Sequence, residues 1–103
     1  MRICFDIDGT ICMPAEGTDY RYAAPVREMI EYVRQAKRDG HWVVLYTARG
    51  SGTGEDWSIV TERQLREWAV PYDEIVFGKP YADLYVDDRA VNVADYRKVM
   101  HVL

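Results

Sequence analysis

The sequence has few cysteines, no excess of positive charge and no long apolar run, and each absence excludes a class of protein. Cys4 and Cys12 are too few for the disulfide framework of a small secreted domain, and both are interpreted as small buried apolar side chains. With 13 Lys and Arg against 17 Asp and Glu, the net charge of −4 argues against a nucleic-acid binder that works by overall charge. Asp6 and Asp8 interrupt the first apolar run, and no stretch approaches the roughly 18 apolar residues of a membrane span. We therefore expect a cytoplasmic protein without a membrane or nucleic-acid partner.

The length and hydrophobic content fit one folded domain over residues 1–103. The chain is 49% hydrophobic, which is ordinary for a globular protein and too high for a disordered one. A chain of 103 residues supports a small core but not a second folded domain.

Four short apolar segments alternate with three amphipathic or capped segments along the chain. The apolar segments are typical of strands buried in a parallel sheet, and they span residues 2–7, 41–47, 74–77 and 84–86. The intervening segments predict a helix that begins at Pro25, one opened by Glu55 and Asp56, and one capped by Asn92. This alternation predicts the α/β class, as a three-layer sandwich around a mostly parallel sheet.

Polar side chains follow each predicted strand at its carboxyl end. They are Asp6, Thr47, Lys79 and the pair Asp87 and Asp88. Because the carboxyl ends of parallel strands meet at one edge of a sheet, and ligands bind there, we expect these residues to converge on one site.

Four carboxylates in one place repel one another unless a cation lies among them. At an effective dielectric of 20, two unit charges 4 Å apart interact by about 4 kcal/mol, so Asp6, Asp8, Asp87 and Asp88 would be costly together. All four offer hard oxygen ligands, and no His or Cys is expected among them. The set therefore indicates Mg²⁺ in preference to zinc.

These segments resemble the four motifs of the haloacid dehalogenase (HAD) superfamily, in the order that this superfamily uses. The resemblance rests on Asp6-Ile7-Asp8-Gly9-Thr10, on Thr47, on Gly78-Lys79-Pro80 and on Asp87-Asp88. A closer similarity, to short HAD proteins associated with capsular polysaccharide synthesis, rests on Tyr46-Thr47-Ala48-Arg49, Pro71-Tyr72-Asp73-Glu74-Ile75 and Val86-Asp87-Asp88-Arg89. The resemblance implies a Rossmann-like core, and the short connections after the first and third strands imply that no cap domain is present.

The resemblance also implies a role for each residue of the motifs. Asp6 would be the nucleophile that forms an aspartyl-phosphate, and Asp8 the general acid and base. Thr47 and Lys79 would bind the oxygens of the transferred phosphoryl group.

The implied Mg²⁺ would be held by the Asp6 carboxylate, the backbone carbonyl of Asp8 and Asp87. Asp88 would be a further ligand or would anchor a metal-bound water, and the sequence does not divide the roles between Asp87 and Asp88. Together these roles imply a magnesium-dependent phosphomonoesterase that acts on a sugar phosphate or a similar phosphorylated metabolite.

An uncapped site of this kind suits a large substrate, or a neighbouring copy of the chain that covers it. Residues 13–22 would be the remaining flap. Arg49 either binds a second anionic group of the substrate or forms a surface salt bridge. The three glycines of residues 50–54 do not form a phosphate-binding P-loop, because no Lys-Ser/Thr follows them.

Two alternatives from other functional classes remain. A phospho-acceptor signalling module also gathers Asp, Thr and Lys around Mg²⁺, but such receivers place their acidic pair after the first strand, whereas here a pair follows the last. The second alternative is a non-catalytic binding module with the same fold. No motif residue is substituted, so the sequence does not support it.

Overall fold

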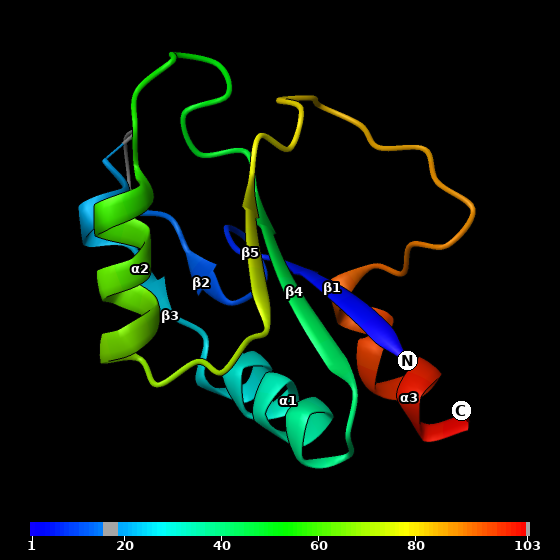
Figure 1. Cartoon of the computed structure of the whole chain (residues 1–103). Helices are drawn as coiled ribbons and strands as arrows, with labels where there is room; N and C mark the ends of the chain where they lie inside the picture. Colours follow the sequence, from blue (N-terminus) through cyan, green and yellow to red (C-terminus); the bar gives the residue numbers. More distant parts are fainter. Residues whose placement is uncertain (16–18, 103) are drawn as a thin grey trace.

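Three parallel strands form the centre of the molecule. The computed structural model describes residues 1–15 and 19–102. The sheet has the order β1-β4-β5, in which Arg2 lies opposite Trp42 and Val44 opposite Glu74 (Figure 1). Its strands are β1 (Arg2–Asp6), β4 (Trp42–Thr47) and β5 (Glu74–Phe77). The predicted α/β class is confirmed, because a parallel sheet is flanked by helices and the described residues contain no extra domain.

All three predicted helices are present, with shifted starts. They are α1 (Arg27–Arg38), α2 (Ser58–Glu67) and α3 (Tyr96–Val102), accompanied by the 3₁₀ turns η1 (Tyr20–Tyr22) and η2 (Val93–Asp95). The first helix begins after Pro25, because Pro25 belongs to β3 (Ala24–Pro25), which pairs antiparallel with β2 (Cys12–Met13). The second begins at Ser58, whose backbone N–H donates to Asp56 at 2.9 Å.

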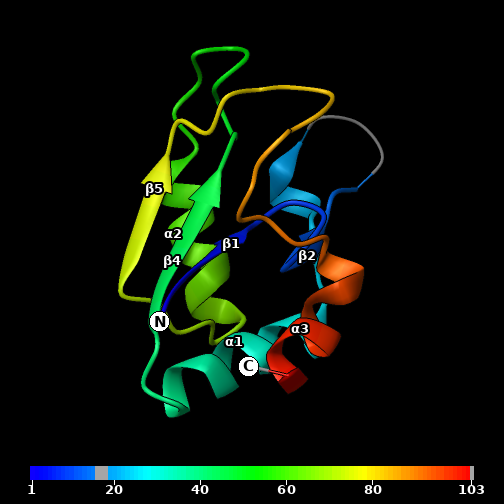
Figure 2. The ribbon, with the colours of Figure 1, turned by 90° about the vertical axis from the view of Figure 1, so that its right-hand side faces the viewer.

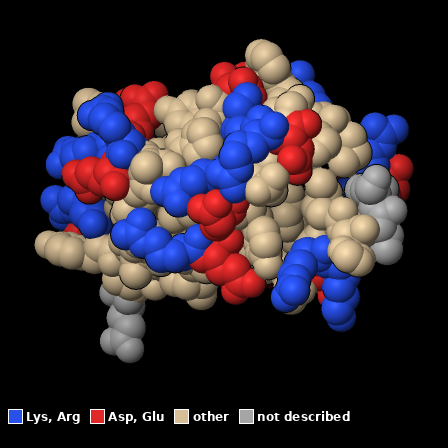
Figure 3. Space-filling view, turned by 90° about the horizontal axis from the view of Figure 1, so that it is seen from below, with Lys and Arg blue, Asp and Glu red and all other residues tan. Residues whose placement is uncertain are grey.

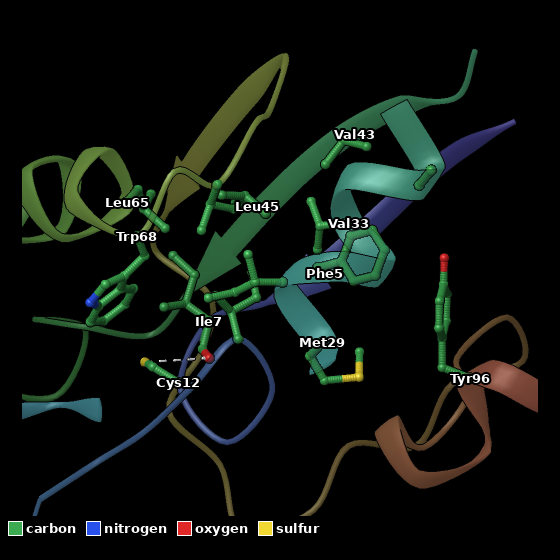
Figure 4. Close-up of a cluster of buried hydrophobic side chains, with 14 residues drawn as sticks. Phe5, Ile7, Cys12, Met29, Val33, Val43, Leu45, Leu65, Trp68 and Tyr96 are labelled. Atoms are coloured by element: carbon green, nitrogen blue, oxygen red, sulfur yellow. Dashed lines mark hydrogen bonds between the residues drawn. The ribbon is translucent and has the colours of Figure 1, made fainter. Parts of the chain in front are cut away.

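The hydrophobic core lies between α1 and one face of the sheet. Phe5, Ile7, Val43 and Leu45 point toward this side because side chains alternate along a strand. They pack with the apolar stripe of α1, which contributes Met29, Ile30, Val33 and Ala36, and with Leu65, Trp68 and Val70 from and after α2 (Figure 4). Ile7, Ile30 and Leu45 are fully buried.

The outward side of α1 is charged. Glu31 accepts from Arg34 at 3.1 Å and from Arg38 at 2.8 Å. Seen from below, the molecule carries acidic and basic side chains next to one another (Figure 3). The helix therefore has the amphipathic character that the sequence predicts.

The opposite face of the sheet is open. Cys4 is exposed and Val76 is 39% exposed, and together with Val44 and Tyr46 they line a shallow hollow. Figure 2 looks onto this side, with α2 behind the sheet. Cys4 is therefore not the buried residue that the sequence suggested, whereas Cys12 is buried.

The predicted fourth strand is wrong. Residues 84–86 belong to an irregular loop, in which Leu84 is 77% and Val86 90% exposed. The Tyr85 hydroxyl donates to the Pro80 carbonyl, and the Tyr85 ring lies over Lys79. Contacts inside this loop thus replace pairing with the outer edge of β1. Tyr96 of α3 packs instead against Phe5, with ring centroids 5.2 Å apart.

The length and polarity of the helices decide whether any of them could span a membrane. Across residues 1–15 and 19–102, every helix is too short or too polar to cross a bilayer.

The α1 contact with the sheet is tested by Ile30→Ala. Ile30 is fully buried, so the truncation leaves a cavity and should lower the free energy of unfolding by about 2–5 kcal/mol. Urea denaturation measures this, with Arg27→Ala on the exposed side of the same helix as the control, where a change within about 0.5 kcal/mol is expected. Equal effects of the two variants would contradict the assigned core.

Candidate active site

Asp6, Thr47 and Lys79 lie together at the carboxyl-end edge of the sheet. β1 ends at Asp6 and β4 ends at Thr47. Just after β5, the backbone N–H of Lys79 donates to the Thr47 carbonyl at 3.0 Å. The Lys79 ammonium lies 3.3 Å from Asp6 Oδ1. The structure thus brings three of the predicted site residues together, from positions 41 and 32 residues apart in sequence (47 − 6 and 79 − 47).

Asp6 is partly withdrawn from water, and its side chain keeps 34% of its exposure. Burial raises the pKa of Asp6 above its ordinary value. The ammonium of Lys79 opposes this rise in pKa, and the neighbouring Asp8 adds to it. The carboxyl of Asp6 therefore depends on Lys79 for the stability of its charged form.

Lys79 is enclosed on its other side by aromatic rings. Its nitrogen lies 4.3 Å from the centroid of Tyr85 and 6.0 Å from that of Tyr46. A ring face attracts a cation at such distances. The ammonium is held between the Asp6 carboxylate and Tyr85.

The chain turns sharply after β1. Gly9 has a φ of 85°, a left-handed conformation that favours glycine, and its N–H donates to the Cys12 carbonyl at 2.7 Å. Ile7 between the two acids is fully buried. This turn places Asp8 next to Arg49, so the two acids have different cationic partners.

Arg49 is a buried partner of Asp8. Its Nε and Nη2 each lie 2.9 Å from one Asp8 carboxylate oxygen, and the side chain of Arg49 is fully buried. The remaining guanidinium hydrogens point to acceptors on Cys12, Thr61 and Gln64. The sequence analysis expected either a substrate contact or a surface salt bridge; the structure shows a salt bridge that is buried inside the protein, and the substrate contact stays a prediction.

Thr47 is also fully buried. Its Oγ1 accepts a hydrogen bond from the Arg49 backbone N–H at 3.0 Å. A hydroxyl has one donor and two acceptor positions, so this bond occupies one acceptor position of Thr47. A ligand oxygen would reach the Thr47 hydroxyl hydrogen only if the residues that cover Thr47 moved.

Asp87 and Asp88 do not join this group. Both are exposed on the loop that follows β5, where Asp87 Oδ1 accepts the backbone N–H of Arg89 at 2.7 Å. Over the part of the chain that the structure describes, no three His, Cys, Asp or Glu side chains are placed to hold a metal ion. The structure does not bring the four carboxylates together, because residues 84–86 form no strand that would carry Asp87 to the sheet edge; their metal-binding roles stay a prediction.

Gln64 is a site neighbour that the sequence analysis missed, and Tyr20 belongs to the predicted flap at 13–22. The Tyr20 ring lies 4.8 Å from the Arg49 guanidinium carbon, and the Gln64 amide donates to the Tyr20 carbonyl at 2.6 Å. The imperfect apolar stripe of α2 was the signal, because its buried side includes the polar Thr61 and Gln64. Of the predicted flap at 13–22, residues 16–18 lie outside the described residues.

The glycine-rich loop follows Arg49. Gly50 has a φ of 83°, and a Cβ there would lie 2.1 Å from the Glu55 carbonyl oxygen. The backbone N–H of Gly54 closes the loop onto the Gly50 carbonyl at 2.8 Å. Close backbone approach thus explains Gly50.

Known proteins were compared with this chain at the level of sequence and structure. No protein-family model and no curated protein matches it. The crystal structure of a target from Vibrio cholerae superposes with a TM-score of 0.81 and 30% identity, over 99% of this chain and 96% of that one. The chain therefore belongs to the same family as the Vibrio cholerae protein.

Two more distant structures share the fold. They are a Pnkp1/Rnl/Hen1 complex, with a TM-score of 0.61 and 21% identity, and the Pnkp1/Rnl/Hen1 RNA repair complex, with a TM-score of 0.63 and 19% identity. The matches cover 84% and 82% of this chain, but 30% and 27% of the matched chains. At this identity the likeness extends to the fold alone.

The raised pKa of Asp6 is tested by Asp6→Asn in metal-free buffer. A carboxyl whose native pKa exceeds its unfolded value favours folding when protonated, and this contribution is lost as the pH rises through the native pKa. The free energy of unfolding of Asp6→Asn minus that of wild type should therefore be larger at pH 7 than at pH 3. The lower pH is below 3.8, the ordinary pKa of an Asp side chain. Urea denaturation at both pH values measures the difference.

Asp83→Asn is the matched control, because Asp83 is exposed on the loop after β5. The same pH dependence in both variants, or a relative loss of stability for Asp6→Asn at pH 7, would contradict the assigned environment of Asp6.

Proposed function

We propose that this chain is a capless HAD-type phosphatase, a magnesium-dependent phosphomonoesterase that works through an aspartyl-phosphate on Asp6. The observation that carries the proposal is the contact of Asp6 with Lys79 beside Thr47, at the edge of the sheet where ligands bind. These residues are also the ones that match the HAD motifs in order. A carboxylate, an ammonium and a hydroxyl in one place suit attack on a phosphate ester.

The chemistry of each side chain fits one part of phosphoryl transfer. The Asp6 carboxylate would attack phosphorus, and Asp8 would serve as acid and then as base. Lys79 and the hydroxyl hydrogen of Thr47 would bind the phosphoryl oxygens, whose charge must be balanced in the transition state. An arriving phosphate would compete with Asp6 for the Lys79 ammonium, which leaves the Asp6 oxygen directed at phosphorus.

The residues expected to hold Mg²⁺ do not fit a metal site as they lie. Asp6 and Asp8 are oxygen donors of the right kind, but they face Lys79 and Arg49, and Asp87 and Asp88 are exposed on a loop. Magnesium dependence is therefore proposed from the sequence motifs alone. The roles given above to the side chains do not involve the ion.

The substrate we propose is a sugar phosphate or a similar phosphorylated metabolite of the cytoplasm. A site without a cap domain would suit a substrate larger than phosphate, and a second copy of the chain would be the simplest cover over it. The resemblance to HAD proteins associated with capsular polysaccharide synthesis favours a phosphorylated sugar. The net charge of −4 disfavours a polynucleotide phosphate as substrate.

The proposal is tested by steady-state turnover of 4-nitrophenyl phosphate and a panel of sugar phosphates, with Mg²⁺ and with chelator. Wild type should turn over with Mg²⁺ and stop with chelator, whereas Asp6→Asn should be inactive because it lacks the nucleophile. Its circular dichroism spectrum should match that of wild type.

Asp83→Asn serves as the control for loss of an acidic side chain and should keep full activity. Pure wild-type protein that releases no phosphate from any of these esters would refute the proposal. A stable phospho-Asp6 found by mass spectrometry, without turnover, would support the phospho-acceptor alternative instead.

A further inference from the structure

We propose that Arg49 is a positioning residue, which holds the Asp8 carboxylate so that one of its oxygens receives the proton of the attacking water. This inference rests on the proposed function and adds a residue to it. In the sequence, Arg49 was expected to touch the substrate or to form a salt bridge. The geometry of its guanidinium gives it a different task.

Every N–H of the Arg49 guanidinium has an acceptor. Nε donates to Asp8 Oδ2 and Nη2 to Asp8 Oδ1, both at 2.9 Å, and Nη2 also approaches Cys12 Sγ at 3.6 Å. Nη1 donates to Thr61 Oγ1 at 3.0 Å and to Gln64 Oε1 at 2.7 Å. A planar fork with two bonds to one carboxylate fixes the rotation of that carboxylate as well as its position.

Asp8 keeps a free acceptor position in this arrangement. A carboxylate offers about four lone-pair positions. Arg49 occupies one on each oxygen, and the Cys12 thiol lies 3.5 Å from Oδ1. The remaining position is on Oδ2, and the Asp8 side chain is 23% exposed, so water can reach it.

Arg49 is itself held rigidly. Its side chain is fully buried, its backbone N–H donates to Thr47 Oγ1, and the Tyr20 ring covers its guanidinium carbon at 4.8 Å. Thr61 and Gln64 belong to α2, which is far from the β1 turn in the sequence. Through Arg49, this helix fixes the orientation of Asp8. Because Arg49 is held by these contacts, it restricts the movement of the Asp8 carboxylate.

Two steps of the proposed reaction use Asp8 differently. In the first, an Asp6 oxygen bonds to phosphorus and the ester P–O bond breaks, with its electron pair leaving on the alcohol oxygen. Nitrophenolate leaves without a proton, so Asp8 is dispensable in this step when the ester is 4-nitrophenyl phosphate. In the second, water bonds to phosphorus and gives a proton to Asp8 Oδ2, while the bond from phosphorus to Asp6 breaks. Inorganic phosphate leaves, the Asp6 carboxylate is restored, and the proton passes from Asp8 to solvent.

The test uses Arg49→Met on 4-nitrophenyl phosphate, with phosphoenzyme measured by mass spectrometry after acid quenching. Loss of orientation should slow the second step alone. The second step should slow about 100-fold, the scale of a general base, so that it becomes limiting; kcat should then fall by up to this factor, with KM falling in parallel and kcat/KM nearly unchanged. Phospho-Asp6 should accumulate in the variant and remain sparse in wild type.

Arg63→Met is the matched control, because Arg63 is exposed on α2, and its kinetics should equal those of wild type. Thr61→Val removes one acceptor of Arg49 without touching Asp8, and it gives the same signature in weaker form if Arg49→Met does not fold. Arg49→Lys keeps the charge without the two-point fork and should recover only part of kcat.

The outcomes separate this inference from the proposed function. If kcat and kcat/KM fall by the same factor, with KM unchanged and no phosphoenzyme, Arg49 has a structural role only and the inference is overturned. Full activity of Arg49→Met overturns it as well. Absence of turnover by wild type overturns the proposed function and the inference with it.

Discussion

Two carboxylates two residues apart coexist in this protein because each has its own cation. Asp6 lies against Lys79, and Asp8 lies against Arg49, at contacts of 3.3 and 2.9 Å. Without these cations, acids so close in a partly buried turn would repel each other and one would bind a proton. The four groups sum to zero formal charge. The position of the β1 turn relative to β4 and the loop after β5 depends on this balance.

The two pairs differ in how firmly they are held. Arg49 is buried and uses all its guanidinium hydrogens within the protein, whereas Lys79 is partly exposed, and its ammonium pairs with Asp6 and lies over the rings of Tyr46 and Tyr85. A charged ligand would therefore displace the Lys79 pair more readily than the Arg49 pair. This asymmetry agrees with the proposed roles, in which Asp6 bonds to phosphorus and Asp8 stays in one orientation while it exchanges protons.

The sequence pattern predicted the parts of the fold that depend on neighbouring residues in the chain. The apolar stripe of α1 and the apolar runs of β1 and β4 identified the core, and the strand-end rule brought Asp6, Thr47 and Lys79 together. Residues 84–86 have a strand-like composition, yet in the structure Tyr85 bonds within its own loop, so nothing delivers Asp87 to the sheet. A strand needs to pair with a partner edge as well as to have apolar residues, and contacts of Tyr85 within the loop replace that pairing here. The sequence pattern does not contain that information. The burial of Arg49 was missed for a related reason, because its acceptors on α2 are 12 and 15 residues away.

The outer margin of β1 carries no strand among the described residues, and the sheet face that bears Cys4 and Val76 is bare. An uncovered margin of this kind offers main-chain N–H and C=O groups to any extended peptide, and apolar segments such as residues 84–86 of another molecule are suitable guests. At high protein concentration, the β1 edge of one molecule would then pair with an extended segment of another. Arg2 begins this margin, but its guanidinium donates to Glu74 of β5 at 2.7 Å, so its charge is paired with the opposite edge of the sheet and does not protect the margin.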